Sequence, residues 1–333
     1  MITEARARKT KISSISRFAV KIMVSAGLMI FLLKWKISIE QIKVLLASLD
    51  RTLLVAGVSV MFMSNLIGSF QWHMLLKASG IMLPFHKTFR FYFVGLFFNN
   101  FLPANIGGDA VKIYDVTKIG SSVYQVIAVT FLDRLLGIFG LCLLATIATV
   151  YLINSGVEGF HILNLAIFIG CMIPAIGLYL FKPFSRLLRR LVRMIRPLSL
   201  DERISSVLDY LGEFKGRKAL VVKLMALSIV IQSLRVITHI LVGTSLGIHI
   251  YAQLIGQFFV FVPLLGIAMV PPYSISGFGV REGLGIILFG TAGIGKTDAF
   301  TMETLTYVVS AMVSLLGLLF FLMRRGEKRK LQE

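Results

Sequence analysis

Two segments of the chain repeat a pattern of helix-breaking, polar and basic residues. Residues 102–112 read LPANIGGDAVK and residues 271–281 read PPYSISGFGVR, at a constant offset of 169. Proline and glycine interrupt a helix and leave backbone N–H groups unpaired. Such N–H groups beside a cation suit a phosphate or a carboxylate. The shared pattern P-x-[NS]-I-x-G-x-x-V-[KR] therefore predicts a duplicated structure with paired anion-binding breaks. Two matched kinks that only shape helix packing would give the same pattern.

Individual residue types in the two copies fit this chemistry. Asn105 and Ser274 can each cap the start of a new helix. Lys112 and Arg281 follow about two helical turns later and supply a positive charge. The candidate substrate-binding residues of the repeat are Asn105, Gly107, Gly108, Asp109, Lys112, Ser274, Gly277, Gly279, Arg281 and Glu282.

Three further charged residues lie inside long apolar runs. Asp133 and Arg134 are adjacent within residues 127–150, and Arg235 lies within residues 220–242. Charge at membrane depth is costly, so such side chains should face the protein interior and pair with one another. We add all three to the candidate substrate-binding residues. A position near the membrane interface, or a role as a packing counter-ion, is the alternative.

The composition shows which kind of protein must position these residues. Among 333 residues 56% are hydrophobic, and 35 basic against 16 acidic residues give a net charge of +19. This excludes an ordinary soluble enzyme and a disordered chain. We predict an all-α integral membrane protein, a polytopic helical bundle of about eight spans with an internal repeat and two broken or re-entrant segments, near 89–102 and 284–289. Apolar runs long enough to cross lie near 18–33, 52–76, 122–153, 160–181, 219–243, 250–271 and 302–323.

The basic residues predict the topology. They are concentrated in the N-terminal arm, in residues 182–223 and after residue 323, which the positive-inside rule places in the cytoplasm. Both termini are then cytoplasmic and the number of crossings is even, so residues 280–292 should cross. Residues 34–51 are expected to form an amphipathic helix in the interface. We predict a single transmembrane domain, 1–333, with repeat halves at about 18–153 and 219–323 and a cytoplasmic basic linker at 182–218.

Nucleic acid, nucleotide and metal ligands are not expected. The positive charge flanks apolar spans and is not interleaved with stacking aromatic residues, so it favours a lipid surface over nucleic acid. Residues 290–297 match the P-loop pattern G-x-x-x-x-G-K-[ST], but a P-loop follows a strand of an α/β sheet. We interpret this segment as a glycine-rich loop between membrane segments. The five histidines and two cysteines show no ligand spacing, so no cofactor is expected.

The polar motifs together resemble a known family. Residues 99–112, the Asp133-Arg134 pair and residues 272–282 look like the pattern of the flippase-like family, also called the lysylphosphatidylglycerol synthase transmembrane region. The resemblance covers roughly residues 15–325 and implies a multi-pass protein of the plasma (inner) membrane that handles lipids. Some members couple a synthase domain to a membrane flippase part. The chain ends at Glu333 without an aminoacyl-transferase domain, so we expect no enzyme activity.

The resemblance and the motifs lead to one main functional hypothesis. We expect a flippase for a membrane lipid or lipid-linked intermediate, with anionic or polyprenyl-linked lipids as substrates. Lys112, Arg134 and Arg281 would bind the phosphate, while Asp109, Asp133 and Glu282 would orient the cations or carry protons. A membrane-embedded transferase acting on a lipid carrier is one alternative. An accessory membrane subunit of a glycosyltransferase is another, and a glycosyltransferase or lipid-modifying enzyme is the candidate protein partner.

Overall fold

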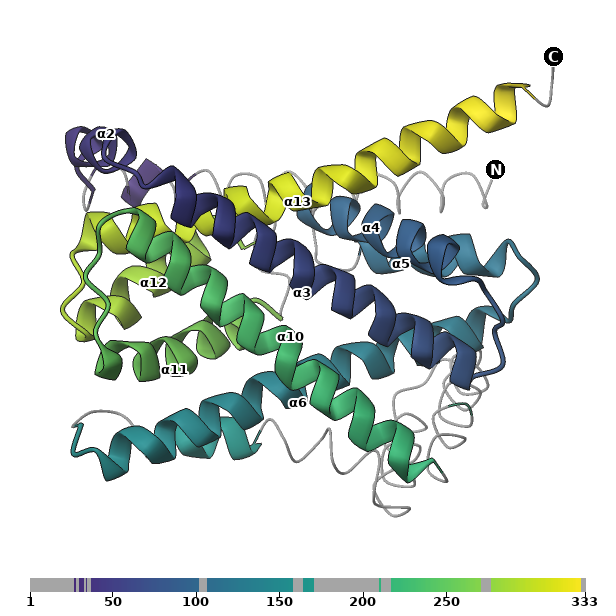
Figure 1. The fold of residues 1–333 in the computed structure, drawn as a ribbon, viewed down its shortest axis with the longest axis horizontal. Coiled ribbons are helices and arrows are strands. Elements are labelled where there is room, and N and C mark those ends of the chain that lie inside the picture. The colour runs from purple at the N-terminus through teal and green to yellow at the C-terminus, as the bar shows by residue number, and fades with distance from the viewer. Residues whose placement is uncertain are drawn as a thin grey trace, which may run out of the picture.

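The computed structural model consists of helices throughout the part of the chain that it describes (Figure 1). The described residues are 27, 30–32, 34, 37–101, 107–157, 164–170, 210, 217–270 and 277–330. Four helices are long and apolar enough to cross a membrane: α3 (Arg51–Ala78), α6 (Val123–Asn154), α10 (Lys218–Ser245) and α13 (Lys296–Lys330). The predicted all-α polytopic membrane fold is confirmed.

The helices recur in one order and with matching lengths. After α3, with 28 residues, come α4 (Phe85–Phe101, 17 residues), α5 (Gly107–Thr117, 11 residues) and the long α6. After α10, also with 28 residues, come α11 (Ala252–Ala268, 17 residues), α12 (Val280–Thr291, 12 residues) and the long α13. The duplication predicted from the motif therefore extends to whole helices. The outer limits of the two halves, near residues 18 and 323, stay a prediction.

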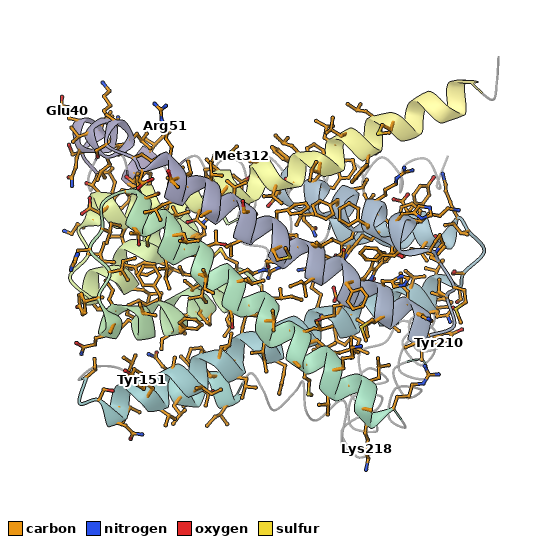
Figure 2. All side chains as sticks on the ribbon, in the orientation of Figure 1. Glu40, Arg51, Tyr151, Tyr210, Lys218 and Met312 are labelled. Atoms are coloured by element: carbon orange, nitrogen blue, oxygen red, sulfur yellow. The ribbon has the colours of Figure 1, made fainter. Side chains whose placement is uncertain are left out.

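The two repeats are inverted relative to each other. Figure 2 shows Arg51 and Lys218, the first residues of α3 and α10, at opposite ends of the bundle. The two helices cross antiparallel, because the backbone N–H of Asp50 donates to the Ser245 carbonyl at 2.8 Å and Ser64 Oγ to the Ile231 carbonyl at 3.2 Å. The packing is exchanged between the halves, with α4 against α13 and α11 against α6. Inverted repeats of this kind are a recurrent plan of membrane transporters.

The two broken segments form re-entrant helical hairpins. At 1.5 Å per residue, α4 and α11 are about 25 Å long and α5 and α12 about 16–18 Å, which is shorter than a hydrocarbon core of about 30 Å. In the second hairpin the Phe289 ring of α12 lies 4.8 Å from the Phe258 ring and 5.5 Å from the Phe261 ring of α11, so α12 runs back along α11. Because α3 and α10 are antiparallel, the hairpins that follow them begin at opposite ends of the bundle (Figure 1).

The expectations that residues 250–271 and residues 280–292 each cross the membrane are wrong. The helix in the second region, α12, has 12 residues and turns back beside α11, so the hairpin enters and leaves at one end. Hydropathy alone did not distinguish a short return from a crossing, since both are apolar. The tips of the two hairpins, 102–106 and 271–276, lie outside the described residues.

Two other expectations concern the segments that flank the bundle. The predicted amphipathic helix is present as α2 (Ile39–Ala47), which is capped by Ser38 and has no buried residue. Its placement in the membrane interface stays a prediction. The P-loop-like segment follows helix α12, not a strand, and passes through Gly293, whose φ of +82° favours glycine, into α13. It therefore joins two helices, as the sequence indicated.

Glycines allow three helices to approach each other closely. A Cβ on Gly108 of α5 would overlap the Gly95 carbonyl oxygen of α4. A Cβ on Gly317 of α13 would overlap the Phe93 carbonyl oxygen on the other side of α4. Small residues at such contacts let membrane helices pack backbone against backbone. The first hairpin is thus held tightly on both faces of α4.

We expect Gly108→Ala to open the first hairpin. Overpacking of this size costs about 1–3 kcal/mol, and here the obstructing atoms are backbone. The melting temperature of the purified protein should fall clearly. Gly283→Ala is the matched control, because Gly283 is helical and no atom lies within 4 Å of an added Cβ. Equal melting temperatures for both variants would contradict the close packing of α4 and α5.

Candidate functional site

The first polar cluster, here named the Asp109 cluster, consists of Asp109 and Lys112 of α5, Asp133 and Arg134 of α6, and Arg235 of α10. Asp133 and Arg235 belong to it through their electrostatic interactions with Arg134 and with each other. Asp109 is its centre. Its Oδ1 lies 3.0 Å from Lys112 Nζ. Its Oδ2 contacts the guanidinium of Arg134 twice: it lies 2.8 Å from Nη2 and accepts a 2.9 Å hydrogen bond from Nε. One buried carboxylate thus joins two cations from two helices.

Lys112 is buried deep in the bundle. Its side chain is 5% exposed, and its ammonium lies 5.1 Å from the Trp72 ring and 5.3 Å from the Tyr92 ring. Aromatic faces attract a cation through their quadrupole, and this attraction is stronger where water is excluded. Lys112 is therefore held by a carboxylate and by two rings from α3 and α4.

A chain of hydrogen bonds joins Asp133 to the crossing of α3 and α10. Gln71 Nε2 donates to Asp133 Oδ1 at 3.0 Å, and the Ser228 hydroxyl donates to Gln71 Oε1 at 2.9 Å. These contacts fix the amide orientation of Gln71, because its nitrogen faces a carboxylate and its oxygen faces a hydroxyl. The Asp133 carboxylate is thereby positioned without a direct cation contact among the described residues.

Arg235 lies one turn from the centre of the membrane-crossing helix α10. Its Nη1 lies 3.4 Å from Gln232 Oε1, and Gln232 Nε2 donates to the Gly137 carbonyl at 3.2 Å. No carboxylate of the described residues lies within ion-pair distance of Arg235. The Asp109 cluster combines three cations with two carboxylates, so its side chains carry an excess positive charge.

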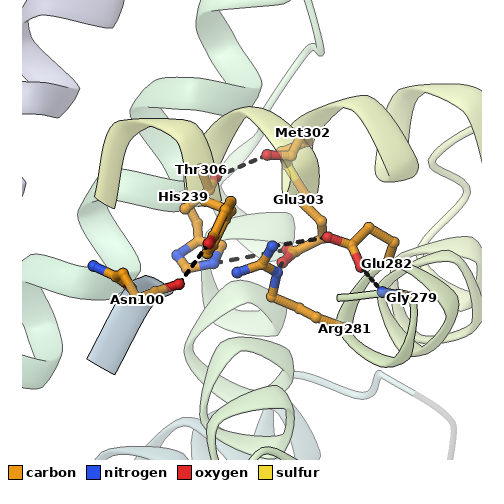
Figure 3. Close-up of polar contacts among 9 residues, drawn as sticks. Asn100, His239, Gly279, Arg281, Glu282, Met302, Glu303 and Thr306 are labelled. Atoms are coloured by element: carbon orange, nitrogen blue, oxygen red, sulfur yellow. Dashed lines mark hydrogen bonds and ion pairs between the residues drawn. The ribbon is translucent and has the colours of Figure 1, made fainter. Parts of the chain in front are cut away.

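The second polar cluster, here named the Glu303 cluster, consists of His239 of α10, Arg281 and Glu282 of α12, and Glu303 of α13 (Figure 3). Arg281 Nη2 donates to Glu282 Oε1 at 2.8 Å, and Arg281 Nε lies 3.6 Å from Glu303 Oε2. His239 Nε2 lies 3.7 Å from Glu303 Oε1. Arg281 corresponds to Lys112 in the sequence repeat, so each half places a cation on its short helix.

Backbone contacts hold the second cluster in place. Glu282 Oε2 accepts a 2.7 Å hydrogen bond from the Gly279 N–H at the start of α12, where Gly279 has a φ of +82°. The Arg281 guanidinium lies 4.9 Å from the Tyr307 ring. The Tyr307 hydroxyl donates to the Asn100 carbonyl at 2.9 Å, near the end of α4. The second cluster therefore contacts the end of the first hairpin.

The structure brings together most of the predicted site residues, but in two groups. Asp109, Lys112, Asp133, Arg134 and Arg235 form the first cluster, and Gly279, Arg281 and Glu282 belong to the second.

The other predicted site residues have backbone roles or lie elsewhere. Gly107 begins α5, and the Gly108 N–H donates to Asn99 Oδ1 at 2.9 Å. Gly277, with a φ of +79°, accepts a hydrogen bond from the Arg281 N–H. Asn105 and Ser274 lie outside the described residues.

The candidate substrate-binding residues predicted from the sequence left out two members of the second cluster, His239 and Glu303. His239 follows Arg235 by one helical turn, and that spacing within an apolar run was the available signal. Gln71 and Tyr307 were missed as well, because a single polar residue on a long helix gives no pattern. No group of three His, Cys, Asp or Glu side chains in the described part of the chain could hold a metal ion.

Comparison with known families identifies the family of this chain. A family model described as the lysylphosphatidylglycerol synthase TM region matches residues 18–327. The chain belongs to this family. No curated protein sequence matches the chain. Membership in the lysylphosphatidylglycerol synthase TM region family indicates a membrane protein with a role related to membrane lipids.

We expect Asp109→Asn to destabilise this lysylphosphatidylglycerol synthase TM region by about 3 kcal/mol or more, because it leaves the buried Lys112 and its neighbour Arg134 uncompensated. The free energy of unfolding in mixed micelles measures the loss. In a Lys112→Met background the same substitution should cost less, since one buried charge has already been removed. Additive costs in the double variant would show that the two side chains are not coupled.

Proposed function

We propose that this protein carries an anionic membrane lipid across the bilayer and binds the phosphate of its headgroup at the Asp109 cluster. The main support is Arg235, an arginine on a membrane-crossing helix without a carboxylate partner among the described residues. A cation at membrane depth is costly unless its charge is compensated. A phosphate diester would supply the missing negative charge and accept two parallel N–H bonds from a guanidinium.

The accessibility of the cluster fits a ligand that arrives from the lipid. The Arg134 side chain is 49% exposed, whereas the Lys112 side chain is 5% exposed. Arg134 would therefore meet the headgroup first, and Arg235 and Lys112 would balance its charge deeper in the bundle. The carboxylates of Asp109 and Asp133 keep the cations in position when the headgroup is absent.

A groove between α4 and α13 combines the two kinds of side chain that contact a membrane lipid. It has a volume of about 240 Å³ and is lined by basic, aromatic and aliphatic side chains, among them Lys87, Arg90, Val94, Phe320 and Met323. Basic groups at one position and apolar groups beside them match a headgroup and an acyl or prenyl chain. Since both phospholipids and polyprenyl-linked lipids carry such a phosphate, we propose anionic lipids of either kind as the substrate class.

The inverted repeats supply a mechanism for alternating access. Transporters with such repeats rock one half against the other around a site at the repeat interface. Here α3 and α10 form that interface, and the hairpins begin at opposite ends of the bundle. We infer that one hairpin opens the site toward each face in turn, while the lipid tail stays in the bilayer.

We infer transport without a covalent step. The carboxylates of Asp109 and Glu282 are each engaged by a cation at 2.8–3.0 Å, and such carboxylates are weak general bases. A glycosyltransferase or lipid-modifying enzyme would be a partner that makes or uses the lipid, not an activity of this chain.

We expect Arg235→Gln to lower lipid transport at least tenfold, because the half-buried guanidinium contributes the unbalanced positive charge of the cluster. Transport of fluorescent phosphatidylglycerol in proteoliposomes, measured by chemical quenching of the outer leaflet, tests this. Lys223→Gln removes an exposed cation from the same helix and should transport as the unaltered protein does. Fluorescent phosphatidylcholine, which has no net charge, should be transported poorly.

Two results would contradict the proposal. Transport of both lipids at equal rates would show that transport does not depend on the charge of the headgroup. Full transport by a folded Arg235→Gln variant would show that Arg235 does not take part in binding the lipid. If no lipid moves but membranes transfer a radiolabelled sugar or aminoacyl group to a lipid, the transferase alternative would be favoured.

We propose a plasma-membrane location with both termini in the cytoplasm, from the distribution of basic residues. In a cysteine-free background, a cysteine at position 249, between α10 and α11, should react with an impermeant maleimide in intact cells. A cysteine at position 118, at the end of α5, should react only after permeabilisation, because it lies at the other end of the bundle. The reverse pattern would invert the orientation.

A further inference from the structure

Glu303 is a buried carboxylate whose contacts are incomplete. It is fully buried on α13, and neither of its oxygens has a hydrogen-bond partner among the described residues. Its neighbours are His239 Nε2 at 3.7 Å and Arg281 Nε at 3.6 Å, both beyond hydrogen-bond distance (Figure 3). Buried polar atoms in native proteins are nearly always hydrogen-bonded, so an exception of this kind points to a function.

The hydrogen bonding of His239 identifies which ring nitrogen can exchange a proton. His239 Nδ1 lies 2.9 Å from the Arg235 carbonyl oxygen. A carbonyl only accepts, so Nδ1 must carry the hydrogen of this contact. Nε2, which faces Glu303, is then the nitrogen that gains or loses a proton. With Nε2 unprotonated, its lone pair faces a carboxylate and no hydrogen lies between them.

The Glu303 cluster is electrically neutral only when it binds one additional proton. Arg281 is the positive member, whereas Glu282 and Glu303 are both carboxylates with fully buried side chains. With neutral His239 the cluster holds one excess negative charge, which is costly in a low-dielectric interior. One added proton, on Nε2 or on the carboxylate, neutralises the cluster and supplies the missing hydrogen between the two groups.

We propose that His239 and Glu303 share one exchangeable proton, and that this proton is bound together with the anionic lipid headgroup. The joint binding of the proton and the headgroup rests on the proposed function. Uptake of the proton neutralises the Glu303 cluster, so its negative charge no longer opposes a phosphate at the Asp109 cluster, one turn away on α10. Binding of the proton therefore raises the affinity for the lipid, and binding of the lipid raises the affinity for the proton by the same factor.

The surroundings of the pair leave few other groups to titrate. From α10 the charged neighbour is Arg235, one turn before His239. From α12 the neighbours are Arg281 and Glu282, and from α13 the neighbour is Tyr307, whose hydroxyl donates to a carbonyl of α4. Helix α11 carries no titratable side chain. The pair is thus connected to the Asp109 cluster through Arg235 alone among these neighbours.

The proton itself can be tested without any lipid. Infrared difference titration of the purified protein between pH 5 and pH 9 should contain, beside any contribution from the other four histidines, a carboxyl and an imidazole change that together amount to one proton. Both Glu303→Gln and His239→Gln should lose this signal, while Glu40→Gln and His86→Gln, which alter exposed residues, should keep it. A folded Glu303→Gln variant with the full signal would overturn the shared proton, as would its absence in the unaltered protein.

The coupling is tested with short-chain phosphatidylglycerol, whose phosphate stays ionised over this range. For one linked proton, the affinity of the unaltered protein should rise by up to about tenfold per unit fall in pH. Glu303→Gln, which mimics the protonated carboxyl, should bind with an affinity independent of pH. Tight binding by the unaltered protein with no dependence on pH would overturn the coupling and leave the proposed function standing. No binding at any pH would overturn the proposed function and the coupling, and the infrared titration would still decide the proton.

Discussion

The cost of burying charge among apolar helices governs the arrangement of this protein. Every strongly buried charge for which the structure describes a contact is next to an opposite charge, an aromatic face or a backbone dipole: Asp109 beside Lys112 and Arg134, and Glu282 beside Arg281 and the Gly279 N–H. The required partners come from different helices, so the hairpins must meet the long helices at defined depths. Close glycine contacts, such as Gly95 with Gly108, make that approach feasible.

The duplication supplies two similar frames that hold different chemistry. Lys112 and Arg281 occupy corresponding places on the short helices, yet the first lies among aromatic rings and the second between two carboxylates. The Asp109 cluster has an excess of cations and the Glu303 cluster an excess of carboxylates. Two opposite imbalances separated by one turn of α10, from Arg235 to His239, favour ligands that supply a negative charge to one cluster and a positive charge to the other.

Much of this arrangement could be predicted from the sequence, because the decisive signals are local. The motif around Gly108 and its copy near Gly277 predicted the duplication and the helix breaks, and the charges in apolar runs predicted buried partners. The remaining features depend on contacts between distant residues. Gly317 packs on Phe93, and His239 meets Glu303, only after the halves have exchanged helices. No periodicity in one segment carries information about that exchange, and the same limit explains why a short returning helix looked like a crossing one.

The exchange of helices between the halves also sets an order of events during synthesis. Helix α4 ends at Phe101, but its packing partner α13 begins at Lys296, about 200 residues later. At the usual pace of translation of about 5–20 residues per second, the α4 surface waits about 10–40 s for that partner. During this time the Phe93 backbone, against which Gly317 of α13 packs in the finished protein, is not covered by α13. The nascent chain therefore needs lipid, the insertion machinery or a membrane chaperone to shield the first hairpin until the last helix arrives.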